Sequence, residues 1–154
     1  MDAITLLKED HKLLRDLTSK LADTTERAVE TSKALLAQIE KILKAHTTIE
    51  EELFYPAFIA AADDMESKRM VAEGFEEHRA ADRKVIPDLH KTDPNSVQWS
   101  GDAKVLKDCI FDHLKEEEEE MFPKVRSLID RRAIRELGDK MAALKEKLLA
   151  EVGA

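Results

Sequence analysis

The sequence predicts an all-α protein, an up-down-up-down four-helix bundle followed by a shorter C-terminal fifth helix. Three observations support this prediction. Glycine and proline are scarce, with four of each in 154 residues, so few positions interrupt a helix. Apolar residues recur every three or four positions along most of the chain, which is the period of a helix with one buried face. The segments between these stretches are short, and short connections favour antiparallel neighbours in a bundle.

Five stretches carry the helical pattern, and capping residues and turn formers suggest their bounds. Asp2 is a suitable N-cap for the first stretch and Asp130 for the last. The residues Thr24-Thr25 and Thr31-Ser32 mark the first turn, and residues 92–101, which are rich in turn formers, make the most obvious loop. The expected helices span residues 2–26, 32–61, 64–91, 102–126 and 131–150.

Prolines fall near the ends of three of these helices. We expect Pro56 to bend or weaken the last turns of the second helix and Pro87 to kink or end the third, because proline lacks a backbone donor and crowds the preceding turn. Pro123 lies near the end of the fourth helix.

Length and charge limit the kind of protein this is. We expect one domain over residues 1–154, with the bundle in about 2–126 and an accessory helix in about 131–150. A net charge of −8 argues against binding to nucleic acid or to anionic membranes. The single cysteine excludes an intrachain disulfide, and no apolar run approaches the ~18 residues of a membrane span. The first residues carry acids and lack the basic start of a signal peptide, so we expect a cytoplasmic protein.

Two stretches share one pattern, and an internal repeat connects them. The stretches 46–56 and 113–123 each contain a histidine, three residues, three glutamates, two spacers, an aromatic residue and a proline. The second begins 67 residues after the first, and His78 follows His11 by the same interval. His11 and His78 each lie 35 residues before the histidine that opens a stretch. Four of the five histidines therefore form two matched pairs.

The repeated residues are predicted to face the core, where they need a partner. Residues four apart share a helix face, so each opening histidine points the same way as the first glutamate after it, on an apolar stripe. An unpaired carboxylate in a core costs several kcal/mol, and no lysine or arginine lies at a matching inward position. Mixed imidazole and carboxylate ligation suits iron, manganese or zinc, and the twofold repeat favours two ions. The predicted metal ligands are His11, His46, Glu50, His78, His113 and Glu117.

A single inward histidine is more often a hydrogen-bonded core residue than a ligand, but four in matched pairs favour the metal. Other conspicuous residues have simpler explanations. Most of the run 116–120 is expected to be a solvated helix face, with Glu120 no closer to the metals than a second layer of contacts. His90 lies outside the repeat and is expected at the surface, and Cys109 is expected to be a packed thiol.

These residues resemble the hemerythrin-like, or HHE cation-binding, domain family. The ordered pattern is His11, His46-x-x-x-Glu50, His78 and His113-x-x-x-Glu117, with Tyr55-Pro56 and Phe122-Pro123 following, and it covers about residues 2–126. The resemblance implies a four-helix bundle around a non-haem di-iron centre with an oxo or hydroxo bridge. It also implies that the six predicted residues hold the two iron ions and that Glu50 and Glu117 bridge them. The family includes oxygen carriers, iron or oxygen sensors, and proteins that handle peroxide or nitric oxide.

The sequence departs from the oxygen carriers of that family. The carriers have a second histidine four residues before the one that matches His78, where this chain has Gly74. They also end with His-x-x-x-x-Asp, where this chain offers Glu117 or, one residue further, Glu118; the repeat favours Glu117. The missing histidine implies an open position on one iron, and Gly74 makes room for a small ligand or for a group such as Tyr55. A regular helix places Tyr55 roughly opposite His46, so we expect it to pack elsewhere or lie at the surface unless Pro56 distorts the helix.

We therefore expect a non-haem di-iron protein that binds or reacts with O2, peroxide or nitric oxide. The missing histidine favours reaction with peroxide, as in a catalase- or peroxidase-like enzyme, over reversible oxygen carriage. The alternative is a regulator in which iron or oxygen binding orders the bundle and a partner recognises the folded state. Iron storage is less favoured, because the pattern lacks repeated exposed carboxylate sites.

Overall fold

The structure is a computed structural model that describes residues 1–24 and 28–153, and all secondary structure within them is helical. This confirms the predicted all-α class. The described residues form five helical rods, three of which contain a π-helical turn (η). The rods are α1 (Ala3–Asp23); α2, η1 and α3 (Val29–Ile49, Glu50–Phe54 and Tyr55–Ala62); α4, η2 and α5 (Met65–Ala80, Ala81–Val85 and Ile86–His90); α6, η3 and α7 (Val97–Glu116, Glu117–Met121 and Phe122–Leu128); and α8 (Arg131–Gly153).

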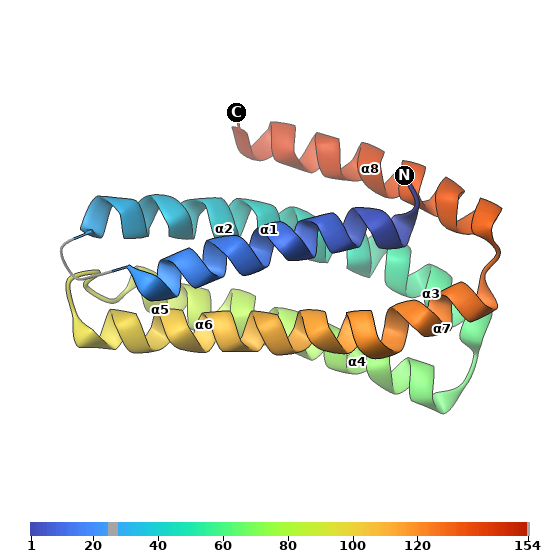
Figure 1. Ribbon diagram of the computed structural model, residues 1–154, viewed down its shortest axis with the longest axis horizontal. Helices are drawn as coiled ribbons and strands as arrows, with labels where there is room; N and C mark the ends of the chain where they lie inside the picture. The colour runs from blue at the N-terminus through green and yellow to red at the C-terminus, as the bar shows by residue number, and fades with distance from the viewer. Residues whose placement is uncertain (25–27, 154) are drawn as a thin grey trace.

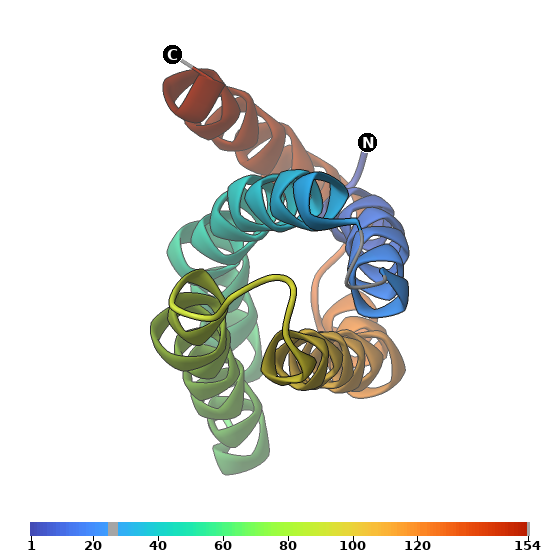
Figure 2. The same cartoon turned by 90° about the vertical axis from the view of Figure 1, so that its left-hand side faces the viewer.

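Four rods lie side by side, and the fifth lies on their outside. Figure 1 shows the rods that contain α1, α2, α4 and α6 extending along the long axis of the molecule. The end-on view in Figure 2 shows these rods around a common centre, with α8 outside them on the side of α1 and α2. Four rods therefore surround a common core of side chains, and α8 packs on the side formed by α1 and α2.

Side-chain caps determine where several helices begin. The predicted caps Asp2 and Asp130 are confirmed, since each accepts a hydrogen bond of 2.8 Å from the backbone N–H three residues later. Ser96 caps α6 by accepting from the N–H of Trp99 at 3.2 Å. The predicted loop 92–101 is therefore too long, because α6 begins at Val97 and the Trp99 side chain is buried.

Two further expectations about helix bounds are wrong. Thr31 and Ser32 lie within α2, which begins at Val29, and do not form the first turn. Residue 26, the expected end of the first helix, lies outside the described residues. The fifth helix is not shorter than the first, because α8 has 23 residues and α1 has 21.

The three prolines distort their helices without ending them. The N–H of Tyr55 bonds to the carbonyl of Glu50, five residues back, directly before Pro56. The same five-residue bond lies directly before Pro87 and Pro123. Because proline has no N–H to donate, a wider turn just before it shifts the hydrogen-bond register and lets the helix continue. The helix does not end early at Pro87. A π turn just before Pro87 accommodates the proline, and α5 extends to His90.

The apolar core is divided into two clusters along the bundle. On α1, Ile4 and Leu7 belong to one cluster, and Leu14 and Leu17 belong to the other. His11 lies between them, so the polar centre is enclosed by apolar layers above and below. No helix in the described ranges is long and apolar enough to cross a membrane.

Candidate metal centre

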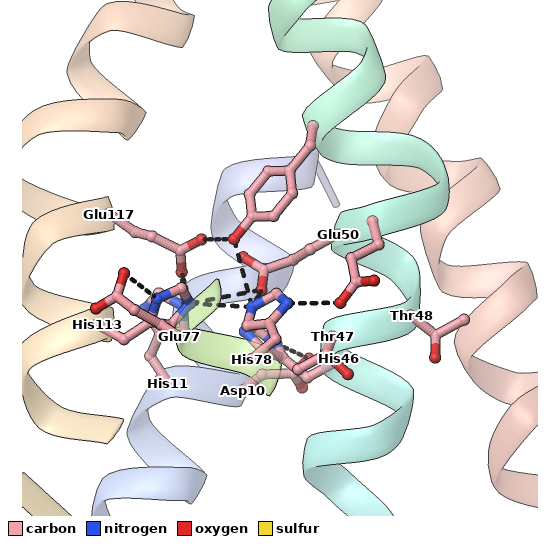
Figure 3. A network of polar contacts seen from close by, with 12 residues as sticks. Asp10, His11, His46, Thr47, Thr48, Glu50, Glu77, His78, His113 and Glu117 are labelled. Atoms are coloured by element: carbon pink, nitrogen blue, oxygen red, sulfur yellow. Dashed lines mark hydrogen bonds and ion pairs between the residues drawn. The ribbon is translucent and has the colours of Figure 1, made fainter. Parts of the chain in front are cut away.

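The structure brings all six predicted ligand residues together in the centre of the bundle. Each is buried, with between 0% and 7% of its surface exposed. Figure 3 shows Glu50 and Glu117 approaching the histidines from opposite sides. The set comes from α1 (His11), α2 (His46), η1 (Glu50), α4 (His78), α6 (His113) and η3 (Glu117).

The six residues form two groups, each compact enough to hold one metal ion. The first contains Glu50 and Glu117 with His11 and His46, and the second contains Glu50 with His78 and His113. Within each group the potential ligand atoms lie within 4.8 Å of one another. Glu50 belongs to both groups, so its carboxylate lies where the two groups meet. The first group contains four residues and the second three, and Glu117 Oε1 also lies 3.5 Å from His113 Nε2 of the second group.

Each of the four imidazoles has a carboxylate behind it. The Nδ1 atoms of His11 and His78 lie 2.7 Å from Glu118 and Glu51, respectively. Those of His46 and His113 lie 3.0 Å from Asp10 and 3.2 Å from Glu77, respectively. An Nδ1–H that donates to a carboxylate leaves the Nε2 lone pair free, and metal-binding histidines usually have such a partner. This arrangement assigns the inward Nε2 atoms as the metal-binding atoms.

The sequence analysis missed these supporting carboxylates, although the repeat contains them. Asp10 and Glu77 directly precede His11 and His78, and they are 67 residues apart. Glu51 and Glu118 directly follow Glu50 and Glu117, with the same spacing. Glu118 is expected either on the solvated face of the run 116–120 or as an alternative ligand to Glu117, not as a partner of His11. Extending the 67-residue comparison to the neighbours of each ligand would have found all four.

The π turn η1 brings Tyr55 into the centre. In a π turn, residue i+5 lies one helical turn after residue i, on the same face of the helix. Tyr55 is therefore placed on the same face as Glu50. Its hydroxyl donates a 2.8 Å hydrogen bond to Glu117 Oε2 and lies 3.4 Å from His78 Nε2. The expectation that Tyr55 packs elsewhere or lies at the surface is wrong, because it assumed a regular helix. The distortion before Pro56 is the exception that the sequence analysis had named.

Tyr55 and Phe122 are repeat mates with the same packing but different chemistry. Tyr55 stacks on His78 with ring centroids 5.7 Å apart, and Phe122 stacks on His11 at 5.5 Å. Gly74 accommodates the extra hydroxyl, because a Cβ at that position would lie 2.7 Å from Tyr55 Oη. The space left by Gly74 is therefore taken by a protein group in this structure.

The electrostatics of the centre favour positive charge. Burial opposes ionisation of Glu50, but the charge of His46 and the close Nε2 atoms of His78 and His113 outweigh it and hold the Glu50 pKa well below its ordinary value. Burial and the nearby charge of Glu50 raise the pKa of Glu117. Burial also opposes protonation of His46 and His113, yet the carboxylates around them raise the pKa of both. Bound cations would compete with protons for these groups.

The donor set fits metal ions, because it leaves buried polar atoms without partners. Among the described residues, Nε2 of His11 and His46, both carboxylate oxygens of Glu50 and Oε1 of Glu117 are buried with no hydrogen-bond partner. Nε2 of His78 and Nε2 of His113 face each other at 3.1 Å, although both rings use Nδ1 for a carboxylate. Unpartnered buried polar groups are costly, and lone pairs facing each other repel. Cations between these atoms would satisfy them.

The site combines four buried imidazoles with two carboxylates, and each imidazole has a further carboxylate at its Nδ1 atom. These features are those of a helical metal-binding protein. The family model of the hemerythrin HHE cation binding domain matches residues 2–125, and the chain belongs to this family.

Several individual proteins are similar over almost the whole chain. An uncharacterized protein from Mycobacterium tuberculosis is 28% identical over 149 residues, which cover 96% of this chain and 88% of the relative. A DNA nickase from Nostoc sp. is 21% identical over 153 residues, but the chain spans only 42% of its length. The crystal structure of a hemerythrin HHE cation binding domain-containing protein from Mycobacterium kansasii matches with a TM-score of 0.84 at 28% identity, covering 98% of this chain and 89% of that one.

Proposed function

We propose that the chain is a non-haem di-iron protein, an up-down-up-down four-helix bundle that binds or reacts with small oxidants. The observation that carries this proposal is the pair of ligand groups that share Glu50. The proposed ligands are His11, His46 and Glu117 with Glu50 for one ion, and His78 and His113 with Glu50 for the other. Imidazole and carboxylate together suit iron, and bound iron supplies a Lewis acid and a redox centre.

The unequal groups favour reaction with peroxide over reversible oxygen carriage. The second group offers three protein atoms, so more of its coordination positions remain for a small molecule. Burial and the charges of Glu117 and Glu50 raise the pKa of Tyr55 well above its ordinary value, so its hydroxyl keeps its proton. The hydroxyl donates this proton to Glu117 Oε2 at 2.8 Å, and its oxygen lies 3.4 Å from His78 Nε2, so the donor sits between the two groups. A donor held at this position suits chemistry that moves protons.

A small apolar cavity next to the histidines suits an uncharged ligand. It has a volume of about 20 Å³, and its lining is mostly apolar, including Leu43, Ala81 and Ile110. The polar lining residues are His46, His78 and His113 with Thr47 and Glu77. This volume holds about one small molecule. O2, peroxide and nitric oxide are uncharged and of this size, so the proposed partners are small molecules.

Nicking of DNA is not extended to this chain. The DNA nickase from Nostoc sp. is more than twice as long as the matched part, so its activity need not lie in the shared region. The net charge of −8 also opposes binding to a phosphate backbone.

Metal analysis combined with an optical spectrum before and after addition of peroxide tests the proposal. We expect two irons per chain, the near-ultraviolet absorption of a bridged ferric pair, and oxygen evolution from peroxide. A single zinc ion, or no metal, would overturn the di-iron assignment. Reversible oxygen uptake without peroxide turnover would overturn only the preference for reaction.

A second candidate function is a regulator whose fold depends on the metal. The unpartnered buried atoms favour it, because the metal would then supply part of the folding free energy. It predicts that removing iron unfolds the bundle or changes binding to a partner. A metal-free protein that melts at the same temperature as the loaded one would count against it.

A further inference from the structure

A small acidic cavity lies beside the candidate metal centre, on a different side from the apolar cavity described above. It lies between α4 and the rod formed by α6 and η3, and its volume is about 20 Å³, room for roughly one water molecule or ion. Glu73, Glu77, Glu116 and Glu120 line it, and His113 and Glu117 lie at its inner end. Figure 3 shows Glu77 and Glu117 beside His113. The cavity therefore joins acidic surface residues to residues of the proposed centre.

The equivalent face of the other repeat is apolar and covered. The repeat mates of Glu73, Glu116 and Glu120 are Leu6, Ile49 and Leu53, each 67 residues earlier. These three side chains pack in one apolar cluster with residues of α8, including Ile134 and Met141. The second repeat therefore has glutamates at the three positions where the first repeat has apolar residues covered by α8.

The fifth helix accounts for this difference between the two faces. It packs on α1, α2 and η1, and Figure 2 shows it on the far side of the bundle from α4 and α6. Lys145 of α8 contacts Asp10, whose repeat mate Glu77 lines the cavity on the uncovered face. One route to the centre is thus closed by apolar packing and a cation, and the other is left open.

Two further observations separate this acidic face from an ordinary solvated one. Glu73, Glu116 and Glu120 are exposed, and within the described residues none of them forms an ion pair, so their charge is not neutralised. At the inner end, Glu117 is 2% exposed, and its Oε1 atom faces the Nε2 atoms of His11 at 3.2 Å and His113 at 3.5 Å without a hydrogen-bond partner among the described residues. A buried acceptor that lacks a partner, at the end of an acidic cavity, is suited to receive a cation.

We propose that Glu73, Glu116 and Glu120 form the entry site through which divalent cations reach the centre. The three carboxylates attract the ion from solution, and Glu77 and Glu117 carry it inward to His113. The inference rests on the proposed function, because it supplies the route by which the proposed metal centre is loaded. Carboxylates at the mouth of a cavity raise the local concentration of cations and increase association rates by about 10- to 1,000-fold.

The test measures how fast the metal-free protein takes up Co²⁺, whose absorption changes when protein ligands replace water. The entry variant carries Glu73→Gln, Glu116→Gln and Glu120→Gln, which remove charge with little change of shape. The control variant carries Glu9→Gln, Glu30→Gln and Glu146→Gln, which are exposed positions outside the cavity lining and remove the same total charge. Rates are measured by stopped flow at several salt concentrations, and the final metal content is measured after long incubation.

We expect the entry variant to load about tenfold more slowly than wild type at low salt, with a weaker dependence on salt and the same final metal content. The control variant should load at nearly the wild-type rate. Equal rates for entry variant and wild type, or equal slowing in both variants, would overturn the entry site while leaving the proposed function intact. A wild-type protein that never takes up metal would overturn the proposed function, and the entry site with it. If the triple variant does not fold, Glu73→Gln and Glu120→Gln are tested singly. If neither single variant loads metal more slowly than wild type, the entry site is overturned.

Discussion

The two repeats of the bundle supply matching ligands but differ in the residues around them. Residues 1–62 contribute His11, His46 and Glu50, and residues 65–128 contribute their mates 67 positions later. The carboxylates behind the histidines also match, so the polar framework is nearly symmetric. The surroundings are not: α8 covers the first repeat, and the second opens to solvent through an acidic cavity. The difference shows that the repeat determines where metals would bind, whereas the neighbouring residues determine access.

Single substitutions between the repeats produce much of this asymmetry. Leu7 corresponds to Gly74, and the space at Gly74 is occupied by the Tyr55 hydroxyl. Arg15 corresponds to Asp82, and Arg15 forms a 2.8 Å ion pair with Glu118 behind His11. An aspartate at the matching position gives Glu51, behind His78, no such partner. The first group is therefore more tightly braced than the second, as expected if the second group carries the chemistry.

The largest expected effect comes from removing one histidine from each group. His78→Ala leaves the second group with two protein ligand atoms, whereas its matched control His11→Ala leaves the first group with three. We expect His78→Ala to retain about one metal ion per chain and His11→Ala to retain close to two with weaker affinity. Metal content by mass spectrometry after dialysis distinguishes these results. Equal losses in the two variants would show that the groups are equivalent.

A smaller effect is expected from filling the space at Gly74. The new Cβ of Gly74→Ala would lie 2.7 Å from Tyr55 Oη, which its hydrogen bond to Glu117 holds in place. We expect a loss of about 1–3 kcal/mol in the free energy of unfolding, as for other overpacked cores. In a Tyr55→Phe background the loss should shrink, giving a coupling of about 0.5–3 kcal/mol between the two sites. Chemical denaturation of the four proteins of this cycle measures the coupling.

Gly101 provides the matched control for that cycle. It also lies within a helix, but nothing lies within 4 Å of a Cβ built there. Gly101→Ala should therefore stabilise the protein by up to about 1 kcal/mol through helix propensity alone. If Gly74→Ala stabilises the protein equally, Tyr55 is free to move and the hydroxyl does not define that space.

The sequence predicted the helices and the six converging residues because both follow from periodicity. Helical spacing placed His46 with Glu50, and the 67-residue repeat paired each residue with a mate. The predicted position of Tyr55 was wrong because the extra residue in a π turn changes which face every later residue occupies. Pro56 was the only sign of this turn in the sequence. The Glu118 side chain was assigned mainly to a solvated face because a run of like charges looks uniform in sequence. Its contact with His11 appears only when α1 and η3 are brought together.

The asymmetry of access could not be predicted in the same way. The apolar stripe of α8 indicates that the helix has a buried face, but it does not say which side of the bundle the face covers. Gly138 provides the structural reason, because a Cβ there would lie 2.6 Å from the backbone nitrogen of Ala3. The backbone of α8 therefore passes directly over the start of α1. This close approach joins residues far apart in sequence and leaves no periodic pattern.

The smallest expected effect, and one that compares the repeats directly, is the pH dependence of the metal-free protein. The pKa values of His46 and His113 are raised above their unfolded value of about 6.5, so both contribute stability below that pH and lose it as pH rises through their folded pKa values. The raised pKa of Glu117 acts in the same direction, whereas the lowered pKa of Glu50 costs stability only as pH falls below about 4.3. The metal-free protein should therefore become less stable from about pH 6.5 upwards. The loaded protein should show the opposite trend, since protons compete with the metal.

His46→Gln and His113→Gln then separate the contributions of the two repeats. His113 lies within 4 Å of three carboxylates, at 3.2 Å from Glu77, 3.5 Å from Glu117 and 3.9 Å from Glu50. His46 lies near two, at 3.0 Å from Asp10 and 3.3 Å from Glu50. The protonated form of His113 gains more from its surroundings, so its loss should flatten the pH dependence more than the loss of His46. Each pKa unit corresponds to about 1.4 kcal/mol, or roughly 3–6 °C in Tm for a chain of this size, which thermal melts at pH 6 and pH 8 resolve. Equal flattening by the two substitutions would mean that the extra carboxylate near His113 has no energetic effect, and that the two repeats differ in access but not in charge.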